Sequence, residues 1–139
     1  MILEFAKHVE TVVTSLNLSG ASRNLYAGDL AIGAPDTAAV IEEPFNDIAD
    51  DTLPDQVVKT FKVVCRGEID NYPSATALAR TVFKALHGKP QVTLPVVDSG
   101  PTYLCNFRCT TPASLGKDDK MRSRCVIYVY CTTQETVAV

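Results

Sequence analysis

Two interleaved sets of apolar side chains between residues 122 and 133 constrain this chain more than any other feature of its sequence. One set is Cys125, Ile127, Val129 and Cys131, and the other is Val126, Tyr128 and Tyr130. Successive side chains of a β-strand point to opposite faces of the sheet, so this segment predicts a strand with two apolar faces. Such a strand belongs at the centre of a sheet, covered on both sides.

Other periodic segments supply neighbours for that strand. Alternation predicts a second strong strand at residues 57–68, in which Lys62 points away from the face that carries Phe61 and Val63. Shorter strands are expected at residues 38–43, 91–97 and 101–110. Residues 25–29 fit either a short strand or a turn, and loops are expected at residues 44–55 and 112–120.

Two segments with apolar residues three and four positions apart predict helices. The first covers residues 2–16 and is ended by the stretch up to Gly20. The second begins near Ser74, which can cap it, and ends at Gly88. Its expected core stripe is Ala75, Leu78, Ala79, Val82, Phe83 and Leu86.

These elements predict an α+β fold, a mostly antiparallel β-sheet flanked by two helices in the order α-β-β-α-β-β-β. The 139 residues are typical of one domain, which we expect to span residues 1–133. Residues 134–139 are expected to form a loosely ordered C-terminal tail.

The charge balance argues against a nucleic-acid-binding protein, because 16 acidic residues outnumber 13 basic ones. The N-terminus lacks the basic start and continuous apolar run of a signal peptide, and no apolar stretch is long enough to cross a bilayer. We therefore expect a protein that is made in the cytoplasm, stays soluble and contacts no membrane.

The five cysteines and two histidines carry no recognisable catalytic pattern. The cysteines lie within strand patterns, and Cys105 and Cys109 would share a face about 13 Å apart, too far for one metal ion or one disulfide. Buried free thiols are the main interpretation, with a metal or redox role as the alternative. His8 and His87 are expected to be structural. No cofactor is predicted, and the protein is not expected to be an enzyme.

Four aspartates gather in the loop at residues 44–55: Asp47, Asp50, Asp51 and Asp55. Clustered carboxylates can bind Mg²⁺ or Ca²⁺, but the spacing is not that of an EF-hand. A solvated loop, a charged contact with a partner and a metal site are the three interpretations.

A second charged segment surrounds the expected turn before the last strand: Lys117, Asp118, Asp119, Lys120, Arg122 and Arg124. It could be a solvated tip, an ion-pairing element between subunits or a contact with DNA. Together with the acidic loop and Lys62, it supplies the candidate interaction residues. Acidic residues 47–55 meeting basic residues 117–124 of a neighbour would set register more than affinity.

The order of several segments resembles that of the tail terminator proteins of long-tailed bacteriophages. The matching segments are Pro44-Phe45-Asn46, the strand Gln56–Gly67, Tyr72-Pro73-Ser74-Ala75, the helix end Leu86-His87-Gly88, and Pro112–Asp118 with the strand from Arg122. They span about Pro44 to Thr133, and residues 20–39 match no segment of the family.

The resemblance implies a structural virion protein that forms a homo-hexameric ring at the top of the tail tube. Its expected partners are further copies of itself, the tail tube protein and the head-tail connector or stopper protein. DNA would pass through the ring without sequence-specific binding. The alternatives are another phage neck or head-closure protein and, from the acidic loop at residues 47–55, a small metal-dependent enzyme.

Overall fold

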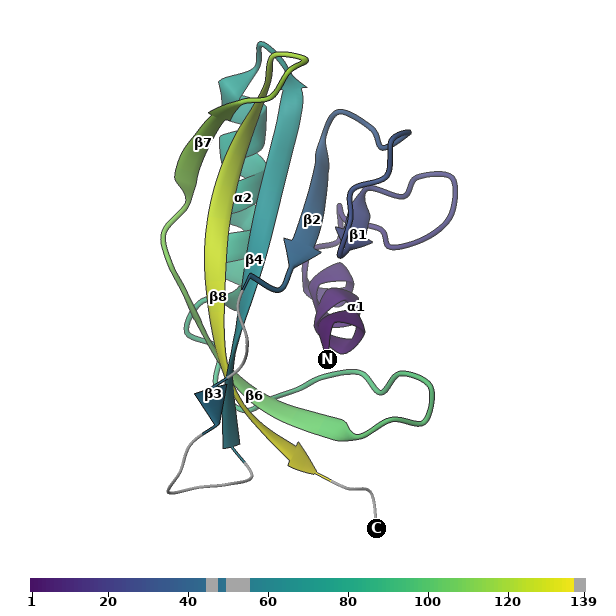
Figure 1. Cartoon of the computed structure of the whole chain (residues 1–139), viewed down its shortest axis with the longest axis vertical. Coiled ribbons are helices and arrows are strands. Elements are labelled where there is room, and N and C mark those ends of the chain that lie inside the picture. The colour runs from purple at the N-terminus through teal and green to yellow at the C-terminus, as the bar shows by residue number, and fades with distance from the viewer. Residues whose placement is uncertain (45–47, 50–55, 137–139) are drawn as a thin grey trace.

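The two long strands expected from alternation form the centre of the fold (Figure 1). The computed structural model describes residues 1–44, 48–49 and 56–136. Its elements are, in chain order, α1 (Ile2–Val12), β1 (Leu25–Ala27), β2 (Ala38–Glu42), β3 (Ile48–Ala49), β4 (Gln56–Ile69), α2 (Tyr72–Leu86), β5 (Val92–Thr93), β6 (Thr102–Cys109), β7 (Ala113–Lys117) and β8 (Arg122–Thr136).

The strands form one sheet in the order β1-β2-β4-β8-β6-β5, with β3 beside β4 and β7 beside β8. β4 and β8 pair antiparallel from Gln56 opposite Gln134 to Ile69 opposite Arg122. β1 is parallel to β2, so the sheet is mixed. The α+β class is therefore confirmed, and the predicted order lacked β1, β3 and β7.

Two predicted segments differ from the structure at the edges of the sheet. Residues 113–117, expected to be a loop, form β7, all of whose residues are exposed. β5 covers only Val92–Thr93 instead of residues 91–97. Pro95 follows closely, and proline cannot donate a hydrogen bond to a strand ladder.

The first helix ends four residues earlier than its apolar stripe suggests. α1 stops at Val12, and Val13 takes an extended conformation with φ −114° and ψ 92°. Residues 11–14 are all β-branched, which lowers helix propensity. Val13 and Leu16 are nevertheless buried, so the apolar pattern located the core while the helix boundary was wrong.

The second helix begins earlier than expected. Asn71, rather than Ser74, is its N-cap, and its side chain accepts a hydrogen bond from the Ser74 N–H. The Ser74 hydroxyl instead ties the helix to β4, because it accepts a hydrogen bond of 2.9 Å from the Glu68 N–H. Phe83 is only partly buried and stacks on His87 with ring centres 4.8 Å apart.

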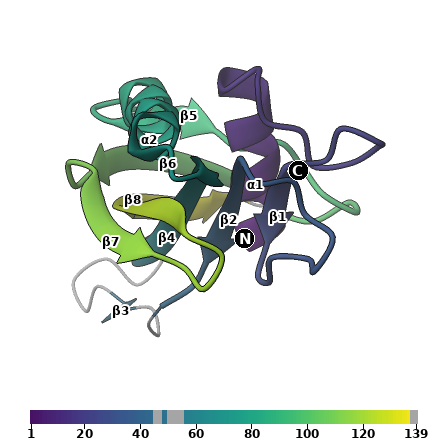
Figure 2. The same cartoon turned by 90° about the horizontal axis from the view of Figure 1, so that it is seen from above.

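Both helices lie on one face of the sheet (Figure 2). Phe5 of α1 stacks on Phe61 of β4 with ring centres 4.3 Å apart. The buried side of the sheet is formed by Phe61, Val63, Cys65, Cys105, Phe107, Cys125, Ile127, Val129 and Cys131. All five cysteines are free thiols.

The opposite face of the sheet carries no helix among the described residues. Tyr130 of β8 is 42% exposed and Val58 of β4 is 41% exposed on this open face. β8 is central, as predicted, but the expectation that it is covered on both sides is wrong within the described chain. This open face, together with the charged end of β4 and β8, positions the candidate site.

Candidate functional site

A tight turn between β7 and β8 is organised by one carboxylate. Asp118 Oδ1 accepts hydrogen bonds from the backbone N–H groups of Lys120 and Arg122, at 3.0 and 2.9 Å. Met121 adopts a left-handed conformation in this turn, with φ 63°. This turn places the charged residues that the sequence predicted to act together at one end of the open face.

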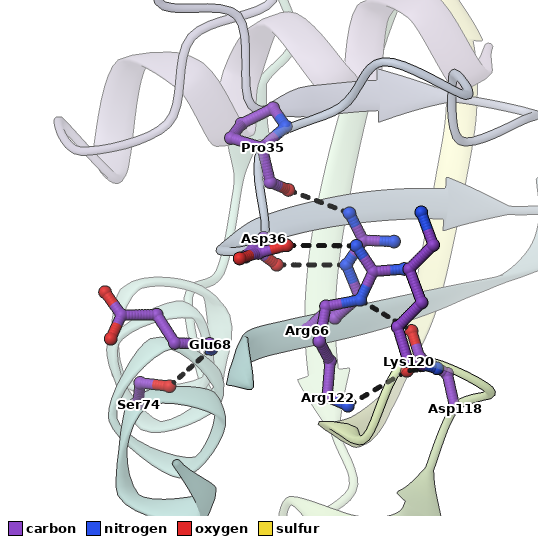
Figure 3. Close-up of polar contacts among 8 residues, drawn as sticks. All are labelled: Pro35, Asp36, Arg66, Glu68, Ser74, Asp118, Lys120 and Arg122. Carbon is purple, nitrogen blue, oxygen red and sulfur yellow. Dashed lines mark hydrogen bonds and ion pairs between the residues drawn. The ribbon is translucent and has the colours of Figure 1, made fainter. Parts of the chain in front are cut away.

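Arg122 links this turn to a distant loop (Figure 3). Its Nε donates to Asp118 Oδ2 at 2.8 Å, and its Nη1 donates to Asp36 Oδ1 at 3.1 Å. Burial acts to lower the pKa of Arg122, but the hydrogen bonds to Asp118 and Asp36 outweigh it and raise the pKa. For Asp118, burial acts to raise the pKa, and the hydrogen bonds from Arg122 outweigh it and lower the pKa. Both groups are therefore held in their charged forms.

Arg66 of β4 binds the same loop through backbone oxygens. Its Nε donates to the Asp36 carbonyl at 2.9 Å and its Nη2 to the Pro35 carbonyl at 2.8 Å (Figure 3). Burial and the neighbouring charge of Arg122 lower the pKa of Arg66. The loop before β2 is thus fastened to β4 and β8 by two buried guanidinium groups.

Arg124 lies directly opposite Arg66 in the β4–β8 ladder. Its Nη2 makes one long hydrogen bond of 3.5 Å to the Leu115 carbonyl, and its buried Nε has no hydrogen-bond partner among the described residues. Both arginines line a groove of about 240 Å³ on the open face. We call it the sheet groove; its other lining residues are Leu30, Ala38, Val40, Glu42, Lys62, Val64, Leu115 and Asp118.

The structure places the remaining predicted interaction residues as follows. Lys62 lies in the sheet groove, with its Nζ 3.9 Å from Glu42 Oε2. Lys117 pairs with Asp70 at 3.0 Å. Asp119 and Lys120 are exposed at the β7–β8 turn. The acidic residues Asp47, Asp50, Asp51 and Asp55 lie outside the described residues.

The described part of the chain contains no group of three or more His, Cys, Asp or Glu side chains arranged to hold a metal ion. His87 caps the end of α2, and its Nδ1 accepts a hydrogen bond of 3.0 Å from the Cys109 N–H. His8 lies against Phe107, and burial lowers its pKa. Burial also raises the pKa of Cys65 to about 12, with a further contribution from the adjacent Cys125. A thiol with so high a pKa is a weak nucleophile.

A family model described as "Bacteriophage tail terminator protein" matches residues 33–132, from the loop before β2 to the end of the central ladder. The chain belongs to this family. No curated protein matches the sequence. Among solved structures, the chain is similar to one described as "Virion of native gene transfer agent (GTA) particle", with a TM-score of 0.60 and 17% sequence identity. That similarity covers 97% of this chain and 96% of the other, and it supports the fold.

Family membership makes the protein a structural component of the phage virion, located in the tail, where it assembles with other virion proteins. The resemblance noted from residues 44–133 is thereby confirmed. No helix in the described part of the chain is long and apolar enough to cross a membrane. The family match also includes residues 33–39, for which the sequence offered no counterpart.

Sequence reasoning missed two members of the charged network, Asp36 and Arg66. Asp36 lies 86 residues from Arg122, so no local spacing links them. Arg66 continues the alternation of β4 and lies on the open face. In the sequence, its charge near the turn after β4 is the one feature that could have marked it as part of the site.

Proposed function

We propose that copies of this chain form a closed ring, a hexamer, that caps the phage tail tube and joins it to the head-completion or neck proteins. The observation that carries this proposal is the family match over residues 33–132. The tail tube protein on one side and the head-tail connector or stopper protein on the other are the proposed partners.

The physical requirements of a ring agree with the fold. A ring built from one kind of subunit uses heterologous contacts, so each copy must offer two different surfaces that fit each other. The two faces of the sheet are unlike: one is covered by α1 and α2 (Figure 2), and the other carries the sheet groove with its charged side chains. DNA would pass through the lumen without base-specific contacts, in keeping with the acidic excess of 16 over 13.

The mass of the purified protein tests the ring. We expect light scattering at high concentration to give the mass of a hexamer, and negative-stain images to show closed rings. Tail tube protein polymerising in vitro should stop at a defined length when this chain is added. A monomer that also fails to stop tube growth contradicts the proposal.

The same measurements separate the ring from the two alternatives. A chelator should change neither mass nor melting temperature, because shape and surface charge hold the ring. A metal-dependent enzyme using residues 47–55 would instead bind divalent cations and lose activity with the chelator. A ring that binds the head-tail connector but never stops tube growth would point to another neck protein.

A further inference from the structure

The sheet groove contains an imbalance of charge. Like charges directly opposite each other destabilise a strand pair, yet Arg66 and Arg124 face each other across β4 and β8. The carboxylates of Asp118 and Asp36 both bind Arg122, and Arg66 is held by backbone carbonyls. Arg124 therefore has no carboxylate partner among the described residues.

The residues that line the groove limit the kind of molecule that could place a carboxylate beside Arg124. Val40 and Val64 form an apolar floor, and Leu115, 39% exposed, lies at the edge. Glu42 at the other end would repel a chain of phosphates, and Lys62 already pairs with it. The groove thus suits a short protein segment that carries one acidic side chain beside an apolar one.

The connection between β5 and β6 presents such a segment. We call residues 95–101 the β5–β6 arm; it begins just after Leu94, whose N–H donates to the Tyr103 carbonyl at 2.9 Å. At its tip, the Gly100 N–H donates to the Val97 carbonyl at 2.9 Å, which closes a tight turn over Asp98 and Ser99. Val96 is 50% exposed.

The tip of the arm has a defined turn conformation. Asp98 and Ser99 both have positive φ angles, 50° and 57°, a region in which aspartate is enriched and serine is uncommon. The Asp98 carboxylate forms no hydrogen bond or ion pair with any residue that the structure describes. The hydrogen-bonded turn holds the Asp98 backbone at the exposed tip of the arm, so its carboxylate is available to a neighbouring molecule.

The arm and the sheet groove lie on opposite sides of the molecule. In Figures 1 and 2 the loop from β5 to β6 extends to the right, away from β7 and the β7–β8 turn. One copy cannot place its own arm in its own groove. A second copy can, and each copy then uses two different surfaces.

We propose that the β5–β6 arm of one copy enters the sheet groove of the next copy, with Asp98 against Arg124 and Val96 against the apolar floor. This inference rests on the proposed ring and assigns its two unlike surfaces. A charged pair that becomes partly desolvated on contact fixes the register between neighbours.

A charge swap tests the contact. We expect Asp98→Arg and Arg124→Glu each to weaken self-association, measured by sedimentation velocity over a concentration series, by about tenfold or more. The double variant Asp98→Arg/Arg124→Glu should recover most of the loss. Asp98→Arg lies on an exposed turn, so its result does not depend on how Arg124→Glu folds.

Arg80, exposed on α2 and outside the sheet groove, supplies the matched control. Arg80→Glu changes the net charge as Arg124→Glu does and should leave self-association unchanged. Asp98→Arg/Arg80→Glu restores the net charge without restoring the pair and should stay weak. Rings whose stability is unaffected by either single change, or regained equally with Arg80→Glu, would overturn this contact while the ring itself stands. A parent protein that forms no ring, alone or on tail tubes, would overturn the ring and this contact together.

Discussion

At the scale of single residues, one carboxylate determines the geometry of the β7–β8 turn. Asp118 accepts hydrogen bonds from two backbone N–H groups and from the Arg122 guanidinium. Arg122 is 8% exposed, so its charge needs partners inside the protein. The turn also lies at the edge of the sheet groove, which Asp118 and Arg124 both line.

Replacing this carboxylate should give a pH-dependent loss of stability. We expect Asp118→Asn to lower the free energy of unfolding at pH 7 by about 1–3 kcal/mol, because a charged acceptor is lost beside a buried guanidinium. The folded pKa of Asp118 lies below its usual value, so its ionised form stabilises the fold above the unfolded pKa of about 3.9. That contribution disappears as the pH falls through the folded pKa.

Urea unfolding of both proteins between pH 7 and pH 3 checks this prediction. The difference in unfolding free energy should be constant at neutral pH and should shrink below about pH 4. A difference that is the same at every pH would mean that packing, rather than charge, is lost.

At the scale of elements, α2 is fixed to β4 by close backbone approach. A Cβ atom added to Gly67 would meet the Ser74 hydroxyl and would lie 2.6 Å from the Ala75 backbone N. Only glycine permits this contact, and the Ser74–Glu68 hydrogen bond forms beside it. The first turn of α2 therefore has a defined position on β4, and the rest of the helix buries its apolar side on β4 and β8.

The burial pattern of α2 predicts unequal effects for two similar truncations. Leu86 is fully buried, so Leu86→Ala should lower the unfolding free energy by about 2–5 kcal/mol. Phe83 is only partly buried, so Phe83→Ala should cost less although it removes more atoms. Thermal melts of the two variants give the comparison. A larger loss for Phe83→Ala would mean that α2 is rotated relative to this structure.

The sequence predicted the elements that have a clear side-chain periodicity of their own. β4, β6 and β8 have clear alternation, and α2 has a complete apolar stripe. β7 was missed because its residues are all exposed and include Gly116, so its pairing with β8 is the only reason for its strand conformation. The end of α1 was misplaced because burial of Val13 and Leu16 continues the apolar period beyond the helix.

The candidate site was predictable only where its residues are close in sequence. The charged segment at residues 117–124 stood out, and the structure adds that Lys117 and Arg122 pair within the chain. The roles of Asp36, Arg66 and the β5–β6 arm are visible only in the folded chain. Their separation along the sequence leaves no local pattern to detect.

At the scale of the whole molecule, one side of the sheet is covered by helices and the other is open. One side is closed by α1 and α2 over a continuous apolar core, and the other exposes Tyr130, Val58 and the sheet groove. A subunit with such sides is suited to repeated contacts with copies in one orientation. The family match places the protein itself in the virion tail.

The acidic loop gives a prediction at this scale. We expect the double charge reversal Asp50→Lys/Asp51→Lys to weaken assembly with neighbouring copies while the isolated subunit keeps its melting temperature. The reason is electrostatic: surface charges set register between subunits more than they stabilise a fold. Light scattering and thermal melting measure the two effects separately. An equal loss of both would show that the loop supports the subunit itself.

The central ladder also decides when the subunit can acquire its shape. Residues 56–69 of β4 must find residues 122–136 of β8, so the middle of the sheet depends on contacts far apart along the chain. Non-local pairing of this kind slows folding. Because β8 follows β4 and α2 in the chain, the apolar side chains that β8 covers stay exposed until β8 has been synthesised. A chain that lacks β8 has neither the central ladder nor the Arg124 wall of the sheet groove, so it does not yet have the surface that we propose receives another copy.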